Sequence, residues 1–258
     1  MIRITYVTIT YNAAKVLQRT LDSVLTQDYP NIEHLIIDGA STDDTLKLVN
    51  NYIVRSNAAE NGHQIQVTSE HDKGIYDAMN KGLRSMTGDY VCFLNAGDFL
   101  PTPDTASRIT QAISNTQQLP AVVYGDTDIV DGEGNFLHHR RLAPPENLSW
   151  KSFRQGMLVC HQAFYARTDF AIATPYNMQY RYSADVDWCI RVMRAAAKEN
   201  VPLQNLHMVV ANYTQEGQTT LHHRESLMER YRVMEHHYGR VQTFLLHCWF
   251  AVRALLKH

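Results

Sequence analysis

The sequence predicts an α/β fold built on a mostly parallel central sheet flanked by helices, with further helices at the C-terminal end of the chain. Two observations predict it. Strand and helix patterns alternate through the first hundred residues, and one of those strands, residues 89–95, is apolar along nearly its whole length. Alternation of this kind produces right-handed crossovers between parallel strands, and a continuous apolar run is typical of a strand buried on both faces.

The first half of the chain shows its strands and helices in a regular order. Residues 2–10 are rich in β-branched side chains and are predicted to form the first strand. Apolar residues then recur at helical spacing over residues 16–25, and residues 41–44 resemble a capping box that opens a second helix. The other elements predicted in this half are strands at 33–38, 64–70 and 89–95 and a helix at 75–86.

The second half is less regular, but it shows no linker, repeat or low-complexity segment, so we expect one continuous domain over residues 1–258. The strands predicted in this half lie at 121–126, 161–167 and 206–213. Helical spacing of apolar residues predicts helices at 185–198, 222–238 and 241–257, with Gly239 between the last two.

Composition excludes several classes of protein. The 258 residues contain 24 Lys and Arg against 26 Asp and Glu, and the net charge of −2 provides no basic field for nucleic acid. The four cysteines form no CxxC pair, which excludes a zinc ribbon and favours reduced thiols in a cytosolic protein. Because no signal peptide and no run of about 18 apolar residues is present, we expect a globular, cytoplasmic protein.

Polar side chains follow each strand of the predicted parallel sheet at its carboxyl end, and we expect them to converge on one edge. The sequence has no GxGxxG motif, GxxxxGKS/T phosphate loop, GxSxG elbow or HExxH pair. Carboxylates at strand ends suit a divalent cation and a phosphorylated ligand, because hard cations prefer oxygen ligands. The polar groups lie at residues 10–12, 38–39, 70–72 and 95–98.

Four short motifs occur in a fixed order in the N-terminal hundred residues. They are TYN at residues 10–12, DGASTD at 38–43, DKGIYDAMNKG at 72–82 and FLNAGD at 93–98. With these motifs the sequence resembles glycosyltransferase family 2, whose members are inverting enzymes with the GT-A fold. The third and fourth motifs are most similar to the branch that builds bacterial exopolysaccharide, including colanic-acid-type transferases. The resemblance continues more thinly through His161-Gln162, Ser183-Ala184-Asp185 and Glu216-Gly217.

The resemblance implies roles for residues at the strand ends. Tyr11 and Asn12 would line the pocket of the nucleotide base, and Asp38 would contact the base or the ribose. Asp72 and Lys81 would help to hold the nucleotide. Each position also has a plainer interpretation, because the aspartates could lie in ordinary turns and Lys81 on the solvated face of a helix.

Residues 95–98 occupy the place of the metal-binding DxD element of the family. Asn95 and Gly97 would lie in the nucleotide-sugar site. Many relatives carry further aspartates in this motif, where this chain has Asn95 and Gly97. Asp98 would therefore be the sole carboxylate of the motif to bind Mg²⁺ or Mn²⁺. The diphosphate and water would supply most other ligands. We expect Asp98 to lie at a polar rim and to bind metal weakly without nucleotide.

The resemblance also places the catalytic base in a Glu-Asp or Ala-Asp pair, which Ala184-Asp185 matches. Asp185 would take the proton from the acceptor hydroxyl. Asp187 is the alternative, but residues two apart point to different sides of a helix. Acidic residues also favour a helix N-terminus without any catalytic role.

The resemblance also concerns histidines of the second half of the chain. His161 would lie near the donor or acceptor sugar, or it is a structural histidine. Relatives can use a residue of this region to contact the metal or the diphosphate, and the resemblance leaves open whether His222, His223 or neither does so here. The adjacent pairs at 138–139 and 236–237 lack ligand spacing and are interpreted as surface residues.

These roles predict an inverting glycosyltransferase that moves a sugar from a nucleotide-diphosphate sugar, most commonly a UDP-sugar, to a glycan or lipid-linked acceptor. Residues 1–100 would bind the donor, residues 101–215 the acceptor, and residues 216–258 would form the C-terminal helices. Two alternatives stay open. One is a non-catalytic sugar-nucleotide or glycan-binding module of the same fold, and the other is a sugar-1-phosphate nucleotidyltransferase, which would need a Gly-rich loop after the first strand.

The C-terminal segment, residues 241–258, is apolar at helical spacing and contains no acidic residue. Two interpretations are open: a helix packed on the domain, and an interfacial helix that lies on an anionic membrane. The second would place the protein peripherally on the inner face of the cell membrane.

Overall fold

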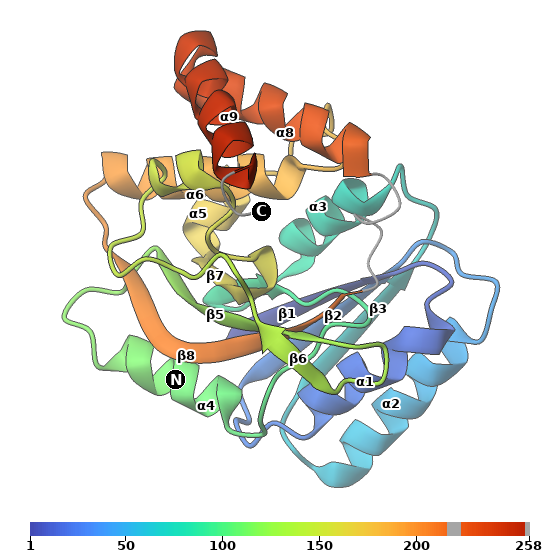
Figure 1. Ribbon diagram of the computed structural model, residues 1–258. Coiled ribbons are helices and arrows are strands. Elements are labelled where there is room, and N and C mark those ends of the chain that lie inside the picture. Colours follow the sequence, from blue (N-terminus) through green and yellow to red (C-terminus); the bar gives the residue numbers. More distant parts are fainter. Residues whose placement is uncertain (216–222, 256–258) are drawn as a thin grey trace.

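The computed structural model describes residues 1–215 and 223–255, which form an α/β fold around one sheet (Figure 1). The described residues contribute eight strands in the order β3-β2-β1-β4-β7-β5-β6, with β8 paired to β5. The fold class predicted from the alternating pattern is therefore confirmed. Four parallel neighbours come from the first half of the chain: β1 Ile4–Thr10, β2 Ile32–Asp38, β3 Gln64–Ser69 and β4 Tyr90–Phe93.

Strands from the second half extend the sheet beyond β4. They are β5 Val122–Val130, β6 Phe136–His139, β7 Phe164–Arg167 and β8 Leu203–Thr214. β7 runs antiparallel between β4 and β5, whereas β8 runs parallel along β5. The reversal at β7 makes the sheet mixed, but it leaves β5 and β8 pointing the same way as β4. The carboxyl end of β8 therefore reaches the same edge as those of β1, β2 and β4.

Helices cover both faces of the sheet and add a further layer on one side (Figure 1). One face carries α1 Ala14–Leu25, α2 Thr45–Ala59 and α4 Thr105–Ser114, and the other carries α3 Ile75–Ser85, α5 Thr168–Ala173 and α6 Ala184–Lys198. α8 His223–Tyr238 packs on α6, and α9 Arg240–Leu255 packs on α8 and projects from the top of the view. No helix among the described residues is both long and apolar enough to cross a membrane.

The centre of the sheet is fully covered, because every residue of β1 and β2 is buried. Ile36 packs with α1 and α2, whereas Leu35 and Ile37 belong to the core cluster on the α3 side. Gly82 allows α3 to lie close to β1, since a methyl group at this position would stand 2.5 Å from Cγ1 of Val7. This close approach brings the first turn of α3 to the edge where the strand ends meet.

Three local predictions differ from the structure. The strand predicted at 161–167 begins only at Phe164, because His161–Ala163 form the 3₁₀ turn η2. Residues 41–44 form no capping box: α2 begins at Thr45, whose N–H donates to the carboxylate of Asp43 at 3.0 Å. The prediction also lacks β6, α5 and α4, although Ala106, Ile109 and Ile113 of α4 recur at helical spacing and are buried.

Candidate active site

The polar groups that follow β1, β2 and β3 lie side by side at one edge of the sheet, as predicted. The N–H of Gly39, just after β2, donates to the carbonyl oxygen of Thr10 at 2.8 Å. The N–H of Glu70, just after β3, donates to the carbonyl oxygen of Asp38 at 3.0 Å. These bonds continue the pairing of the parallel strands into the loops, so the first residues of the loops lie side by side in the plane of the sheet.

Asp38, expected to contact the base or the ribose, is buried at the end of β2. Its carboxylate oxygens accept hydrogen bonds from the hydroxyls of Thr10, Ser41 and Ser69 and from the N–H of Ser41. Burial alone would raise the pKa of Asp38, but these hydrogen bonds outweigh it and lower that pKa. The N–H of Asn12 donates to the Ser41 hydroxyl at 2.8 Å. Asp38 and Asn12 therefore both hold the loop that follows β2.

Tyr11 and Asp72, predicted from different strand ends, both lie against Gly39. A methyl group on Gly39 would stand 2.8 Å from Oδ2 of Asp72 and 3.3 Å from the ring of Tyr11. The Tyr11 side chain is 67% exposed, so an aromatic ring faces solvent beside a carboxylate. Lys81 lies nearby on α3 but is bound to the chain: its Nζ is 3.0 Å from the carboxylate of Glu70.

Asp98 follows β4 and is only 5% exposed, so the expectation of a polar rim is wrong. Its Oδ2 accepts a hydrogen bond from Nε2 of Gln162 at 2.7 Å, and its Oδ1 accepts one from the N–H of Thr214 at 3.1 Å. The backbone of Gly97, at φ +102°, is bound by the hydroxyls of Thr20 and Thr214. The turn η2 and the end of β8 thus close over the loop and exclude water from Asp98.

Burial raises the pKa of Asp98 to about 6, although hydrogen bonds from Gln162 and the N–H of Thr214 oppose the shift. The folded-state pKa lies above the ordinary value of 3.8, so the stability gained from the proton is complete below 3.8 and is lost as the pH rises through about 6. Between pH 4 and pH 8 the free energy of unfolding should therefore fall by about 2 kcal/mol more in the wild type than in Asp98→Asn.

Urea denaturation of both proteins across this pH range, with a chelator present, measures the effect. The Asn side chain has the same size and cannot ionise, so all other titrating groups cancel in the comparison. Parallel pH profiles of the two proteins would show that the Asp98 carboxyl does not titrate in this range.

Among the described residues, no group of three or more His, Cys, Asp or Glu side chains could hold a metal ion. Asp98 is accompanied by the amide oxygen Oε1 of Gln162, which is buried without a hydrogen-bond partner although Nε2 of the same amide donates to Asp98. A carboxylate and an unsatisfied amide oxygen fit a hard divalent cation that takes its other ligands from elsewhere. His222 lies outside the described residues, as does the side chain of His223, so their contact with metal or diphosphate stays a prediction. Glu216 of the family resemblance also lies outside the described residues.

His161 joins the loop after β4 to the first turn of α6. Its Nδ1 lies 3.3 Å from Oδ2 of Asp185, and its Nε2 lies 2.9 Å from Nδ2 of Asn95. The hydroxyl of Tyr76 donates to Oδ1 of Asp185 at 3.2 Å. Burial alone would raise the pKa of Asp185, but the hydrogen bonds from His161 and the N–H of Val186 outweigh it and lower that pKa. The structure thus brings together three of the predicted site residues around an ionised carboxylate.

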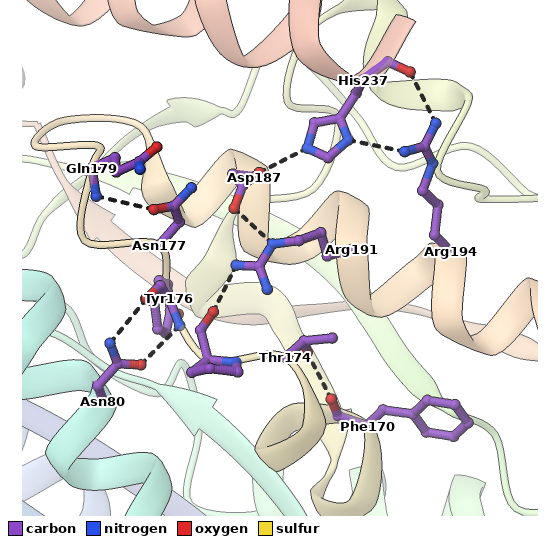
Figure 2. Close-up of polar contacts among 11 residues, drawn as sticks. Asn80, Phe170, Thr174, Tyr176, Asn177, Gln179, Asp187, Arg191, Arg194 and His237 are labelled. Atoms are coloured by element: carbon purple, nitrogen blue, oxygen red, sulfur yellow. Dashed lines mark hydrogen bonds and ion pairs between the residues drawn. The ribbon is translucent and has the colours of Figure 1, made fainter.

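Asp187, the alternative base, contacts other residues (Figure 2). Its Oδ1 lies 2.7 Å from Nε2 of His237 on α8, and its Oδ2 accepts a hydrogen bond from Nε of Arg191 at 2.7 Å. The His237 side chain is 1% exposed, so the interpretation of this histidine as a surface residue is wrong. It is buried because α8 packs on α6. Of the two aspartates, Asp185 is the one that contacts predicted site residues.

Several residues that shape the site are absent from the prediction. Tyr76 belongs to the motif at 72–82 but received no role. The amide of Asn80 bonds both the N–H and the carbonyl oxygen of Tyr176, which ties α3 to the segment before α6 (Figure 2). Glu229 of α8 accepts hydrogen bonds from the N–H groups of residues 181–183, directly before α6. No local pattern could have identified Glu229, because its partners lie far away in the sequence.

The sequence of this chain is similar to a known protein family and to individual proteins with assigned names. The family model described as Glycosyl transferase family 2 matches residues 5–181. The chain belongs to glycosyltransferase family 2. The PGL/p-HBAD biosynthesis glycosyltransferase of Mycobacterium tuberculosis is 35% identical over 209 residues, which cover 81% of this chain and 75% of that protein. Chondroitin synthase of Escherichia coli is 25% identical over 216 residues, which cover 81% of this chain and 28% of the synthase.

Solved structures of similar shape confirm the GT-A fold for this glycosyltransferase family 2 member. S. aureus TarS in complex with UDP-GlcNAc matches with a TM-score of 0.70 at 17% identity, over 90% of this chain and 64% of the TarS chain. A mannosyltransferase from Pyrobaculum calidifontis, in complex with GDP-Man and Mn²⁺, matches with a TM-score of 0.61 at 18% identity. That match covers 98% of this chain and 64% of the mannosyltransferase chain. This chain therefore spans slightly less than two thirds of each solved chain.

Proposed function

We propose that this protein transfers a sugar from a nucleotide-diphosphate sugar to an acceptor hydroxyl with inversion of configuration. The observation that carries the proposal is the environment of Asp185, whose side chain is 17% exposed, is bonded through both oxygens and has a lowered pKa. The carboxylate takes the proton of the acceptor hydroxyl while that oxygen attacks the anomeric carbon opposite the departing diphosphate. A single displacement inverts the configuration and requires no nucleophile from the enzyme.

The donor occupies the edge formed by the loops after β1, β2 and β3. The exposed ring of Tyr11 provides a surface on which a nucleotide base can stack, with Asp72 beside it. Asp38 acts through the loops that it holds, because its oxygens already accept hydrogen bonds from the protein. Asn12, Lys81 and Gly97 complete the nucleotide-sugar site. We infer a UDP-sugar as donor, supported by the TarS structure solved with UDP-GlcNAc.

Asp98 and the amide oxygen of Gln162 would hold Mg²⁺ or Mn²⁺. The cation supplies Lewis-acid neutralisation of the diphosphate leaving group when it is bound. The mannosyltransferase with a similar fold, solved with Mn²⁺, supports this role. Because the carboxyl of Asp98 must be ionised to bind a cation, its pKa of about 6 limits metal binding at acid pH.

A thermal-shift screen tests the proposed donor site. UDP-glucose, UDP-galactose, UDP-GlcNAc, GDP-mannose and dTDP-rhamnose are added with and without Mn²⁺, and we expect one of the UDP-sugars to raise Tm most, and only with Mn²⁺. In Asp98→Ala the Mn²⁺-dependent part of the shift should disappear. If no nucleotide sugar raises Tm in either condition, the donor site is wrong. Release of the nucleoside diphosphate from the best donor separates a transferase from a non-catalytic binding module.

The acceptor is inferred from the C-terminal helix and from relatives. α9 packs through Leu246 and Phe250 on the core, which agrees with the packed interpretation for one of its sides. Five further apolar side chains of this helix are exposed: Val241 75%, Phe244 60%, Leu245 61%, Trp249 56% and Val252 46%. Together with the absence of acidic residues from this helix, the exposed set fits an anionic bilayer surface. We infer a lipid-linked or cell-surface glycan acceptor that is met at the membrane.

The double variant Phe244→Ser/Trp249→Ser tests membrane contact. Two exposed aromatic side chains that enter the interface contribute about 3 kcal/mol together, so we expect binding to vesicles of phosphatidylglycerol and phosphatidylcholine to weaken by roughly a hundredfold. Co-sedimentation with the vesicles measures it. Phe136→Ser/Leu137→Ser removes exposed apolar residues from β6 instead and should bind as the wild type does. Wild-type protein that ignores the vesicles, or that forms dimers through α9, would contradict the assignment.

A further inference from the structure

We propose that His161 is a positioning residue that holds the carboxylate of Asp185 in the orientation needed to receive the acceptor proton. This role rests on the function proposed above, because it concerns how the base is held. It differs from the contact with a donor or acceptor sugar that the family resemblance implies for His161. Four observations support it: the ring contacts, the tautomer they require, the rigidity of the turn, and the second donor to Asp185.

The ring of His161 lies between two side chains of the site and bonds both. Nδ1 is 3.3 Å from Oδ2 of Asp185, and Nε2 is 2.9 Å from Nδ2 of Asn95. The side chains of His161 and Asp185 are 13% and 17% exposed. A ring that is enclosed on both nitrogens has little remaining capacity to bind a sugar directly. Its contacts instead suit a residue that fixes the orientation of the Asp185 carboxylate.

These contacts define the tautomer of a neutral ring. The structure places the amide nitrogen of Asn95 toward the ring, and because this nitrogen can only donate, Nε2 of His161 is the acceptor in this arrangement. The proton then resides on Nδ1, where it is donated to the carboxylate of Asp185. The opposite tautomer would direct two lone pairs at each other, one from Nδ1 and one from Asp185. Asn95 thereby makes His161 a donor to the base.

The backbone of His161 is held rigidly, which gives the ring a defined position. His161 begins η2, and the N–H of Ala163 closes this turn on the carbonyl oxygen of Cys160 at 3.0 Å. The next residue, Gln162, is anchored twice: its side chain donates to Asp98, and its carbonyl oxygen accepts a hydrogen bond from Sγ of Cys92 on β4. The turn that carries the ring is therefore fixed to the same strand and loop that form the donor side of the site.

Asp185 is oriented from two directions. His161 bonds Oδ2, and the hydroxyl of Tyr76 on α3 bonds Oδ1 at 3.2 Å. These side-chain donors, together with the N–H of Val186, fix the plane of the carboxylate, which still has a lone pair for the acceptor hydroxyl. Loss of His161 would remove the bond to Oδ2 and leave the carboxylate held by Tyr76 and the N–H of Val186, with less control over its orientation. Misplacement of a reacting group by about 1 Å can reduce turnover by about a hundredfold.

Two substitutions of the same ring separate the two nitrogens. In His161→Asn the amide nitrogen is bonded to Cγ, as Nδ1 is, so it can still donate toward Asp185. In His161→Gln the amide lies one bond further out, near the position of Nε2 and Asn95. Both replacements are polar and uncharged, so a difference between them does not come from the polarity of the site.

The donor chosen by the thermal-shift screen is used with Mn²⁺, and kcat, donor KM and donor Kd are measured for each variant. We expect His161→Gln to lower kcat by about tenfold to a hundredfold with donor KM within about twofold of the wild type. His161→Asn should recover most of the lost kcat. In the Asp185→Asn background, His161→Gln should cause no further loss, because the group that it positions is gone.

The outcomes separate the two proposals. If His161→Gln raises donor KM and Kd, or if its cost persists undiminished in the Asp185→Asn background, His161 contacts substrate and the positioning role is wrong. If His161→Asn is no more active than His161→Gln, the Nδ1 hydrogen bond is not the important contact and the role is also wrong. If Asp185→Asn itself turns over as the wild type does, the proposed function fails whatever the histidine variants show.

Discussion

Asp185→Asn is expected to lower turnover by about 10²–10⁴-fold, which is the usual contribution of a general base. The substitution keeps the size of the side chain and removes its basic oxygen. Its amide oxygen can still accept from His161, and its NH₂ can donate to the Tyr76 hydroxyl, which is able to accept. The fold and the donor site should therefore be preserved. The loss should appear in kcat rather than in donor KM, because proton transfer develops in the transition state.

Asp169→Asn is the matched control for this experiment. Asp169 also lies in the first turn of a helix, α5, and is paired with Arg167 at 2.7 Å, but it is exposed and has no contact with the site. We expect its turnover to stay within about twofold of the wild type, since a single exposed ion pair contributes little. Full turnover in Asp185→Asn, with donor binding intact, would show that Asp185 is not the base.

The arrangement of the strand ends could be predicted from sequence because parallel sheets impose it. Alternating strand and helix patterns determine that β1, β2 and β4 run the same way, and this alone places Thr10, Asp38 and Asn95 at one edge. The contact between Asn95 and His161 follows less directly, because it requires β7 to return beside β4. The resemblance to glycosyltransferase family 2 indicated His161 and Asp185, and the structure places their side chains in contact.

The burial of Asp98 could not be predicted, because its partners come from distant parts of the chain. Gln162 is 64 residues away and Thr214 is 116 residues away. Local composition around residues 95–98 indicates only a polar loop, whereas burial depends on which segments close over it. The same limit explains His237: helical spacing predicts α8, but not the face of α8 that packs on α6. The predictions for Asp98 and His237 were therefore wrong because burial at both positions depends on long-range packing.

Asp187→Ala is expected to lower the free energy of unfolding by about 3 kcal/mol, because it leaves the hydrogen-bond donors of His237 and Arg191 without their acceptor. The side chains of Asp187 and His237 are 2% and 1% exposed and lie 2.7 Å apart. Arg194 donates to Nδ1 and to the carbonyl oxygen of His237, so a neutral ring carries its proton on Nε2, facing Asp187 (Figure 2). Removal of the carboxylate would leave Nε2 buried without an acceptor and would loosen α8 from α6.

Asp128→Ala is the control, because the pair of Asp128 with His139 has the same 2.7 Å separation but a histidine side chain that is 79% exposed. We expect a change of at most about 1 kcal/mol there, so burial rather than distance would account for the difference.

Burial alone would raise the pKa of Asp187, but His237 and Arg191 outweigh it and lower that pKa. Its stabilising contribution is therefore present above the ordinary value of 3.8 and is lost as the pH falls through the lower folded-state pKa. Urea denaturation at pH 7 and pH 3 should show that the difference in free energy of unfolding between wild type and Asp187→Ala becomes smaller in acid. If Asp187→Ala and Asp128→Ala lower the free energy of unfolding equally at pH 7, Asp187 is not the residue that fixes α8 to α6.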